Sequence, residues 1–511
     1  MSQWTVLPIV LPAIVAPFLV LALRYHLGRQ RIVSVAATGL LVAIAIWLYV
    51  LASDGAPRPY LLGSWPAPFG IVLVLDRLSA TMLVLTAVLA LAVVLYAIAG
   101  WDGRGRHFHA LFQFQLMGIN GAFLTGDVFN LFVFFEVMLI ASYGLLLHGG
   151  GARRLKAGFH YVAINLIGST LFLFAVGIIY AVTGTLNMAD LAGKVAQVAP
   201  ENEALLRTGA LLLFLVFALK AALVPLHWWL PGAYAAAPGP AAALFMIMTK
   251  VGAYAILRVY TLVFGADAGA IAQVAAPWVT PAALLTVAVG AAGVLASQTF
   301  LGLACFSVVW SMGSLLATLG LFDLAGVTAS LYYLVHSTLV GAALFLLADL
   351  LGEHRGALAD RLVPGPLLAR ATRLAALFFV AAIAMTGLPP LSGFLGKLFI
   401  LDASRVSPAG AWIWTFVLGT SLVVILGFAR AGSTLFWKGA PAGETPRSAP
   451  KRGVALPVTV CASLLGMTAL LTVFAGPLTR EFGATARQVF EPQAYVRAVL
   501  PPASPTALSG R

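Results

Sequence analysis

Residues 213–231 read LFLVFALKAALVPLHWWLP, a nearly continuous apolar run that contains a lysine, Lys220, and then Pro225. About 20 apolar residues are enough for a helix to cross a bilayer. Proline lacks the backbone N–H that continues a helix, so Pro225 breaks or kinks it. A broken helix is tolerated inside a membrane where it lines a polar cavity. The stretch therefore predicts a membrane helix that is interrupted beside a buried lysine.

The rest of the chain has the same apolar character. Of its 511 residues, 61% are hydrophobic and 9% are charged, whereas about 25% of a soluble domain is charged. The apolar runs are continuous and do not alternate, which argues against a β-barrel. We therefore predict an all-α integral membrane protein of about 14 transmembrane helices. The predicted spans are residues 4–23, 32–52, 72–99, 108–125, 128–147, 159–183, 208–226, 240–264, 275–296, 300–321, 327–348, 374–401, 411–436 and 455–476.

The loops between these spans differ in positive charge on the two sides of the membrane. One side has four basic residues, Arg58, Lys194, Arg207 and Arg405. The other has sixteen, namely Arg24, Arg29, Arg31, Arg104, Arg106, Arg153, Arg154, Lys156, Arg355, Arg361, Arg370, Arg373, Lys438, Arg447, Lys451 and Arg452. Because cytoplasmic loops carry the excess of Lys and Arg, both termini are predicted to lie outside the cytoplasm. The net charge of +13 then reflects topology, and we expect no nucleic-acid partner.

Metal and cofactor motifs are not evident in the sequence. Cys305 and Cys461 are isolated in apolar segments, without the spacing that holds zinc or an iron–sulfur cluster. His107 and His109 lie near a loop, where solvated positions are expected rather than a metal site. We therefore expect no cofactor, no metal site and no covalent catalytic site in this chain.

The informative residues are the ionisable ones inside predicted spans, because a charge at the bilayer centre costs about 2.5 to 3.5 kcal/mol. Glu136 is the only acidic residue well inside a span. Lys220, Lys250 and Lys397 are the lysines so placed, and His336 is central to residues 327–348. Amines and imidazoles buried in this way can exchange protons near neutral pH.

A second helix break is predicted near Lys397. Pro389 and Pro390 precede this lysine, whereas Pro225 follows Lys220. The two lysines are on the seventh and twelfth predicted spans, five apart and therefore oppositely directed. This arrangement is what an inverted repeat of five helices would give.

Each of these residues also has a structural interpretation. Glu136 could be neutralised by a lysine without moving protons, and the two lysines beside the breaks could be fixed charges. Lys250 could only tune its neighbours, and His336 could be a hydrogen-bonded packing residue. Arg77 and Arg258 are near span ends, where a long side chain can reach the interface, so we expect passive roles for both.

The segments around these residues resemble the antiporter-like fold shared by the proton-pumping subunits of respiratory complex I and by Mrp-type multisubunit cation/proton antiporters. The strongest part is KAALVPLHWWLP at residues 220–231, with APGP at 237–240 and KVGAYAILR at 250–258. GDVFNLFVFFE at 126–136, TGTLNMAD at 183–190 and the chain length are more similar to the D subunit of Mrp antiporters. The chain departs from many relatives after His336, where it reads STLVG without another lysine.

The resemblance implies 14 helices with two inverted five-helix repeats and broken helices 7 and 12. It also implies a glutamate–lysine pair, Glu136 and Lys220, continued by Lys250, His336 and Lys397 as a proton or ion relay. The expected regions are 1–107, a three-helix region; 108–264 and 275–437, the two repeats; and 438–511, a last transmembrane helix with a polar tail.

The function expected from the resemblance is that of one subunit in a Na⁺ or K⁺/proton antiporter of the bacterial inner (plasma) membrane. Its expected partners are other membrane subunits, protons, the cation and the lipid bilayer. The alternative is a proton-pumping membrane subunit of an NADH:quinone oxidoreductase or a membrane-bound hydrogenase. The sequence leaves open which cation is exchanged, whether its path lies in this subunit, and the stoichiometry.

Overall fold

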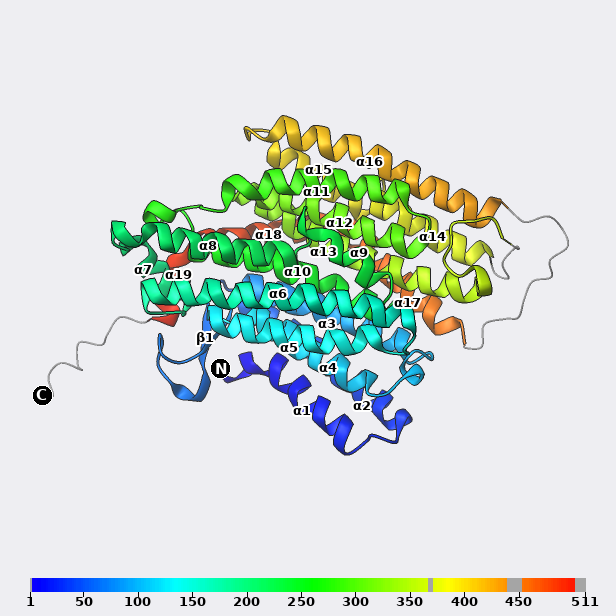
Figure 1. Cartoon of the computed structure of the whole chain (residues 1–511), viewed down its shortest axis with the longest axis horizontal. Coiled ribbons are helices and arrows are strands. Elements are labelled where there is room, and N and C mark those ends of the chain that lie inside the picture. Colours follow the sequence, from blue (N-terminus) through cyan, green and yellow to red (C-terminus); the bar gives the residue numbers. More distant parts are fainter. Residues whose placement is uncertain (1, 366–370, 439–452, 501–511) are drawn as a thin grey trace, which may run out of the picture.

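The computed structural model of the protein describes residues 2–365, 371–438 and 453–500. Its long helices run side by side along one axis and form a bundle (Figure 1). The helices are α1 (Leu7–Leu21), α2 (Leu27–Ala52), α3 (Arg77–Ala97), α4 (Phe108–Leu124), α5 (Val128–Leu147), α6 (Ala152–Thr183), α7 (Met188–Lys194), α8 (Pro200–Lys220), η5 (Leu226–Trp228), α9 (Trp229–Tyr234), α10 (Gly239–Leu262), α11 (Ala276–Ala296), α12 (Phe300–Leu319), α13 (Leu324–Arg355), α14 (Ala371–Thr386), α15 (Ser392–Ser404), α16 (Gly410–Gly432), α17 (Ala455–Val473), α18 (Ala475–Phe490) and α19 (Pro492–Val499).

Twelve helical segments in the described part of the chain are long and apolar enough to cross a membrane. This confirms a helical, multi-pass membrane protein. Two predicted spans are outside this set. Residues 108–125 form α4, which has 17 residues, and residues 374–401 form the two shorter helices α14 and α15. The count of 14 spans and the inverted five-helix repeats stay predictions.

Both predicted helix breaks are present, which confirms that part of the fold. α8 ends at Lys220, and the chain turns before it enters η5 and α9. α14 ends at Thr386 and α15 begins at Ser392, with Pro389 and Pro390 between them. In each case proline cannot supply the N–H that the next helical turn requires.

The centre of the bundle consists of the helices that carry Lys250 and His336. Every residue of α10 is buried, and α13 and α12 are buried over most of their length. In the outer helices α1, α2, α16 and α17, a third or less of the residues in the apolar stretch is buried. A helix that is apolar all round belongs in the core of a large membrane bundle. The ionisable groups on α10 and α13 are therefore as far from lipid as the fold allows.

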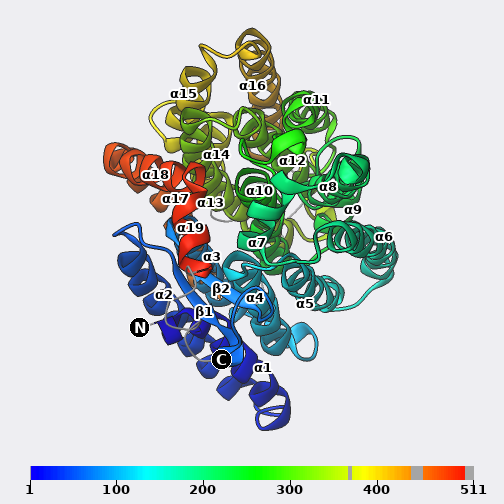
Figure 2. The same cartoon turned by 90° about the vertical axis from the view of Figure 1, so that its left-hand side faces the viewer.

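Two elements at one end of the bundle were not predicted. Residues 72–75, expected to begin a span, form strand β2 (Val72–Leu75), which pairs antiparallel with β1 (Arg58–Leu61). The region expected to be a polar tail forms α18 and α19, which bury one apolar face each. Figure 2 shows α18 and α19 across the end of the bundle, close to β1 and β2. Such half-polar helices lack the continuous apolar run that marks a membrane span.

Four of the basic residues used for the topology prediction, Arg370, Arg447, Lys451 and Arg452, lie outside the described residues. The same holds for 439–452 and 501–511 of the last predicted region. The first described residues and α19 are both at the left of Figure 1, near β1 and α7. The two ends of the described chain are thus at the same end of the bundle.

The close contact of α11 with α12 depends on Gly290. A Cβ atom at this position would be 2.4 Å from the backbone nitrogen of Trp310 and 2.6 Å from its Cα. Small residues allow membrane helices to approach closely, and overpacking a tight interface costs about 1 to 3 kcal/mol. We predict that Gly290→Val lowers the thermal stability of the purified subunit or complex. The measurement is the loss of monodisperse protein on heating in detergent.

The matched control is Gly177→Val on α6, where an added Cβ meets nothing within 4 Å and the residue is exposed. It makes the same change of helix propensity without a steric clash. Equal stability losses in the two variants would contradict the packing argument.

Candidate functional site

Glu136 lies in the middle of α5 and faces α6. The hydroxyl of Ser169 donates a hydrogen bond to Oε1 of Glu136. One turn earlier on α6, Asn165 is anchored by its side-chain N–H, which donates to the carbonyl of Tyr161 at 2.8 Å. The amide oxygen of Asn165 is thereby turned toward α8.

Lys220 is the last residue of α8 and is buried. Its Nζ donates a hydrogen bond to Oδ1 of Asn165 at 2.8 Å. Among the described residues, the contact between Glu136 and Lys220 therefore passes through Ser169 and Asn165 of α6, and no direct ion pair joins them. The expected glutamate–lysine pair is thus indirect in this structure.

The break after Lys220 is stabilised by neighbouring helices. The indole N–H of Trp229 donates to the carbonyl of Leu219 at 3.0 Å, and Thr286 on α11 accepts from the N–H of Val224 at 2.9 Å. A Cβ at Gly252 would be 2.6 Å from the nitrogen of Ala221. Gly252 therefore lets α10 pack directly on the end of α8. Lys250 is two residues away, about 200° around the helix axis, and therefore lies on the opposite face of α10.

Lys250 is fully buried in the middle of α10. Its Nζ has no hydrogen-bond partner in the described part of the chain. A buried amine without a partner costs free energy, and water is the partner that such a polar site commonly recruits. Among the five predicted site residues, Lys250 is therefore the one whose charged group has no hydrogen-bond partner in the described part of the chain.

His336 on α13 is also fully buried. Its Nδ1 is 2.8 Å from Oγ of Ser392, the first residue of α15, whereas its Nε2 has no partner among the described residues. A Cβ at Gly393 would be 2.9 Å from Nε2. His336 therefore connects the central helix to the second helix break.

Lys397 on α15 reaches back across that break. Its Nζ donates hydrogen bonds to the carbonyl of Thr386, at the end of α14, and to Oγ of Ser421 on α16 at 2.7 Å. The same Nζ is 4.2 Å from the ring centroid of Trp310. Gly387, with φ of +75°, leaves room for the lysine stem, because a Cβ there would be 2.7 Å from Cδ of Lys397.

The five residues predicted from the sequence thus occupy one row of neighbouring helices. The row runs from α5 through α6, α8, α10 and α13 to α15. At one end of the row, hydrogen bonds connect Glu136 to Lys220 through Ser169 and Asn165 of α6. At the other end, a hydrogen bond connects His336 to Ser392 of α15, the helix that carries Lys397. Between described residues, no hydrogen bond joins Lys250 to Lys220 or to His336, so the middle of the row is not connected by direct hydrogen bonds.

Several buried charges were not anticipated from the sequence. Arg258 was expected to reach the membrane interface. Instead it is buried, and its Nη2 is 2.6 Å from Oδ2 of Asp76. Tyr254 accepts a hydrogen bond from Nε of Arg258 at 3.3 Å, and the ring of Tyr495 on α19 lies 5.4 Å from the guanidinium carbon. Asp76 precedes α3 at the end of a strand, so no helical pattern marked it. Arg77, as expected, is near the surface and pairs with Glu481 at 2.8 Å.

His109 was expected to be solvated, and this prediction is wrong. It is buried, and its Nε2 is 3.1 Å from Oδ2 of Asp102. Arg31 contacts the same carboxylate at 2.6 Å. Burial disfavours the charged form of Asp102, but hydrogen bonds from His109 and Arg31 outweigh it and hold its pKa at about 2. Through Asp102, this cluster connects α2 to the loop before α4.

Known proteins resemble the chain over almost its whole length. The family described as NADH:quinone oxidoreductase/Mrp antiporter, TM, matches residues 125–425, which include all five row residues. This chain belongs to that family. Membership of the family identifies a membrane transport subunit rather than a catalytic enzyme.

Individual members of the NADH:quinone oxidoreductase/Mrp antiporter family agree with the assignment. The D subunit of the probable K⁺/H⁺ antiporter of Rhizobium meliloti is 42% identical over 98% of each chain. The D subunit of the Na⁺/H⁺ antiporter of Alkalihalophilus pseudofirmus is 35% identical over 98% of this chain and all of its own. A chain of the Mrp complex from Dietzia sp. DQ12-45-1b is 28% identical, has a TM-score of 0.88, and is matched over 98% of this chain and 100% of its own. The predicted resemblance to the Mrp D subunit is confirmed.

The ion pair between Asp76 and Arg258 gives a test of the buried charges. Removing one partner of a buried pair leaves the other uncompensated and costs about 3 to 5 kcal/mol. We predict that Asp76→Asn, which keeps the side-chain cap on Ser79 N, strongly destabilises the purified complex. The double variant Asp76→Asn/Arg258→Met should recover much of the loss, because no unpaired charge remains. The measurement is thermal inactivation in detergent. A double variant less stable than Asp76→Asn alone would contradict the argument.

Proposed function

We propose that the chain is the proton-translocating subunit of a multisubunit Na⁺ or K⁺/proton antiporter. The observation that carries the proposal is the row of ionisable residues inside the bundle, half-buried at Glu136 and buried at the other four, with helix breaks beside Lys220 and Lys397. Residues of this kind are rare inside membranes and mark ion or proton pathways. Both breaks place a lysine against main-chain carbonyls or polar side chains, as in discontinuous helices of transporters.

In this proposal, Glu136 sets the charge state of Lys220 through Ser169 and Asn165. Lys220 accepts and releases a proton at the first break. Lys250 and His336 pass charge across the centre with the help of water. Lys397, held by Thr386 and Ser421, is the terminal group at the second break. A fixed carboxylate beside Lys220 favours its protonated form, and a change at Glu136 therefore alters proton exchange at the lysine.

The names of the relatives support antiport, because both curated relatives described above are antiporter D subunits. Their names differ in the cation, and we therefore propose monovalent cations as a class. Other membrane subunits complete the complex. We further propose that the chain lies in the bacterial inner membrane with both termini outside the cytoplasm, which follows from the loop charges.

The alternative function is a redox-driven proton pump, since the family also includes NADH:quinone oxidoreductase subunits. In that case the redox centres would be in other subunits, and this chain would use the same row of residues. The subunits that copurify with the chain distinguish the two functions. Small membrane proteins alone support the antiporter, and soluble subunits with flavin or iron–sulfur clusters support the pump.

Glu136 provides the functional test. We predict that Glu136→Ala abolishes Na⁺- or K⁺-induced collapse of a proton gradient in inverted vesicles, because Lys220 loses the charge that sets its protonation. Glu136→Asp should keep partial activity, since it retains the charge at a shorter reach. Assembly is checked on native gels, with Glu201→Gln, on an exposed residue of α8, as the control. Normal exchange by a well-assembled Glu136→Ala complex would exclude this role.

A further inference from the structure

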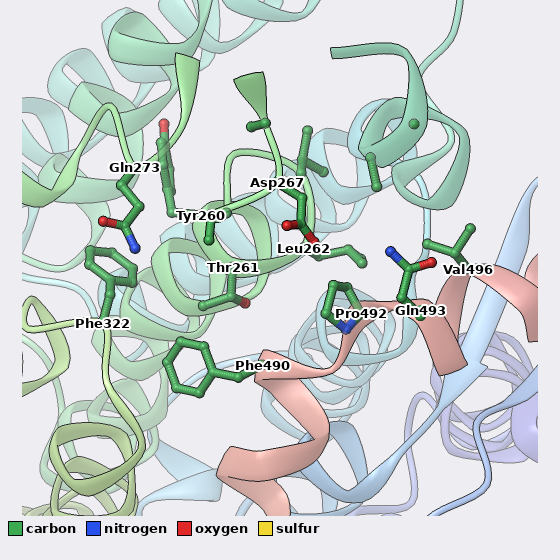
Figure 3. A pocket seen from close by; sticks show the side chains of 16 residues that line it. Tyr260, Thr261, Leu262, Asp267, Gln273, Phe322, Phe490, Pro492, Gln493 and Val496 are labelled. Atoms are coloured by element: carbon green, nitrogen blue, oxygen red, sulfur yellow. The ribbon is translucent and has the colours of Figure 1, made fainter. Parts of the chain in front are cut away.

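Lys250 is fully buried and shares one face of α10 with Tyr254, which is one turn further along the helix. The ring of Tyr254 packs on Phe123 of α4, with 4.9 Å between the ring centroids. Figure 3 shows the end of α10, where Tyr260 and Thr261 border a pocket at the end of the bundle. Lys250 is ten residues before Tyr260, about 15 Å along the helix axis. The groups that surround its amine therefore come from neighbouring helices inside the bundle.

α4 contacts α10 and runs in the same direction. In the segment that precedes α4, the indole N–H of Trp101 donates to Oδ2 of Asp349 at 2.7 Å. Asp349 also lies against Gly239 at the start of α10, where an added Cβ would be 2.5 Å from its own Cβ. Near the ends of the two helices, Phe123 meets Tyr254. Residues at equal distances before this last contact therefore lie at the same level along the bundle.

α4 presents a glutamine close to the level of Lys250. Gln115, Ile119 and Phe123 recur at every fourth residue and so share one face of α4. Because Phe123 lies opposite Tyr254, Ile119 is level with Lys250, and Gln115 is one turn earlier. A helical side chain leans toward the N-terminus of its helix, so the amine of Lys250 extends toward the level of Gln115. Gln115 is fully buried, and neither its Oε1 nor its Nε2 has a partner among the described residues.

α3 and α13 also contact α10, and both run in the opposite direction. Asp76, just before α3, pairs with Arg258 near the end of α10, whereas Tyr96, near the end of α3, donates to Asp349. Asp349 is near the end of α13 and lies against the start of α10. A cavity of about 10 Å³ marks the faces of the three helices that meet one turn beyond Lys250. Its walls include Leu78 and Met82 of α3, Ala253 and Leu257 of α10, and Leu331 and Leu334 of α13.

Thr86 and Ser337 continue these faces of α3 and α13 to the level of Lys250. Thr86 is four residues after Met82, and Ser337 is three residues after Leu334. Both side chains are buried. The hydroxyl of Thr86 donates to the carbonyl of Met82 at 2.7 Å, and that of Ser337 donates to the carbonyl of Leu334 at 3.2 Å. Each hydroxyl oxygen can still accept a hydrogen bond from a further donor.

Four helices thus bring polar groups to one level of the bundle, and these groups complement one another. The amine of Lys250 has three donors, the amide of Gln115 has two donors and an acceptor, and the hydroxyls accept. Leaving such groups unpaired in an apolar interior costs free energy. A buried water molecule typically makes two to four hydrogen bonds to polar groups of this kind.

We propose that Gln115, together with Thr86 and Ser337, positions the ordered water that hydrates Lys250 and exchanges protons with its amine. The inference rests on the proposed function and deepens it, because it adds positioning residues from α3, α4 and α13 to the row. These residues are on the side of α10 that faces away from Gly252 and the first helix break. Protons therefore reach Lys250 through this water and not through a direct contact with Lys220.

Loss of the amide tests the proposal. In vesicles that contain the whole complex, Gln115→Leu should lower the maximal rate of cation-induced proton exchange about tenfold, because water at a charged amine loses a hydrogen-bond partner. Proton transfer at Lys250 then becomes the slow step, so the ratio of the rates in H₂O and D₂O should rise. Gln113→Leu is the matched control, since Gln113 is equally buried on the same helix but faces Ser34 and Thr38 of α2. It should leave the rate and the ratio unchanged.

A second pair of variants separates positioning from packing. Thr86→Val removes the hydroxyl at nearly the same side-chain size and should lower the rate by a smaller factor, whereas Thr86→Ser keeps the hydroxyl and should retain the rate. Assembly of each complex is checked on native gels. Unchanged rates in assembled Gln115→Leu and Thr86→Val complexes would overturn the proposal. A loss in Gln115→Leu without a higher isotope ratio, or an equal loss in Gln113→Leu, would assign the effect to packing and would also overturn it.

The hydration of Lys250 is also measurable without transport. If the unaltered complex shows no cation-dependent exchange, the antiporter function fails, and electron cryo-microscopy of the purified complex, at a resolution that shows ordered water, decides this proposal separately. Water density that connects the amine of Lys250 to the amide of Gln115 supports it. A map in which no water contacts both groups overturns it.

Discussion

A helix that stops inside an apolar bundle leaves main-chain carbonyls without partners, and the rest of this structure depends on how they are satisfied. At the second break, the amine of Lys397 donates to the carbonyl of Thr386. At the first break, Trp229 donates to Leu219, while Lys220 turns to the amide of Asn165. An unsatisfied polar group in hydrocarbon costs several kcal/mol. Each break therefore requires polar neighbours, and these neighbours place ionisable groups on adjacent helices.

The two breaks differ in how they engage their lysines. Lys220 reaches a side-chain amide that is itself linked to Glu136 through Ser169, so a carboxylate influences this lysine. Lys397 instead contacts a main-chain carbonyl, a serine hydroxyl and the face of Trp310, which are all neutral. Among the described residues, the row therefore carries its negative charge at one end. The two lysines therefore have electrostatically different surroundings.

Much of the fold could be predicted because membrane spans are local in sequence. Residues 128–147 were predicted and observed with the same bounds, and the prolines marked both breaks. The strand at Val72–Leu75 and the amphipathic α18 and α19 were missed, since short or half-polar segments lack a span's signature. The ionisable residues of the row could be predicted from the sequence, because an ionisable group inside a membrane span costs free energy and is rare. Ser169, Asn165 and Asp76, the partner of Arg258, could not be predicted, because contacts between distant segments leave no local sequence pattern.

The central claim is that Lys220 releases and regains a proton, and an arginine at this position tests it most directly. Arginine keeps the positive charge but does not deprotonate, since its pKa is above about 12. The measurement is cation-induced collapse of a proton gradient by vesicles with Lys220→Arg, Lys220→Ala and, as a control on an exposed lysine, Lys156→Arg. The account predicts that Lys220→Arg is nearly as inactive as Lys220→Ala and that the control is fully active. Exchange at the unaltered rate by an assembled Lys220→Arg complex would contradict it and would make Lys220 a fixed counter-charge.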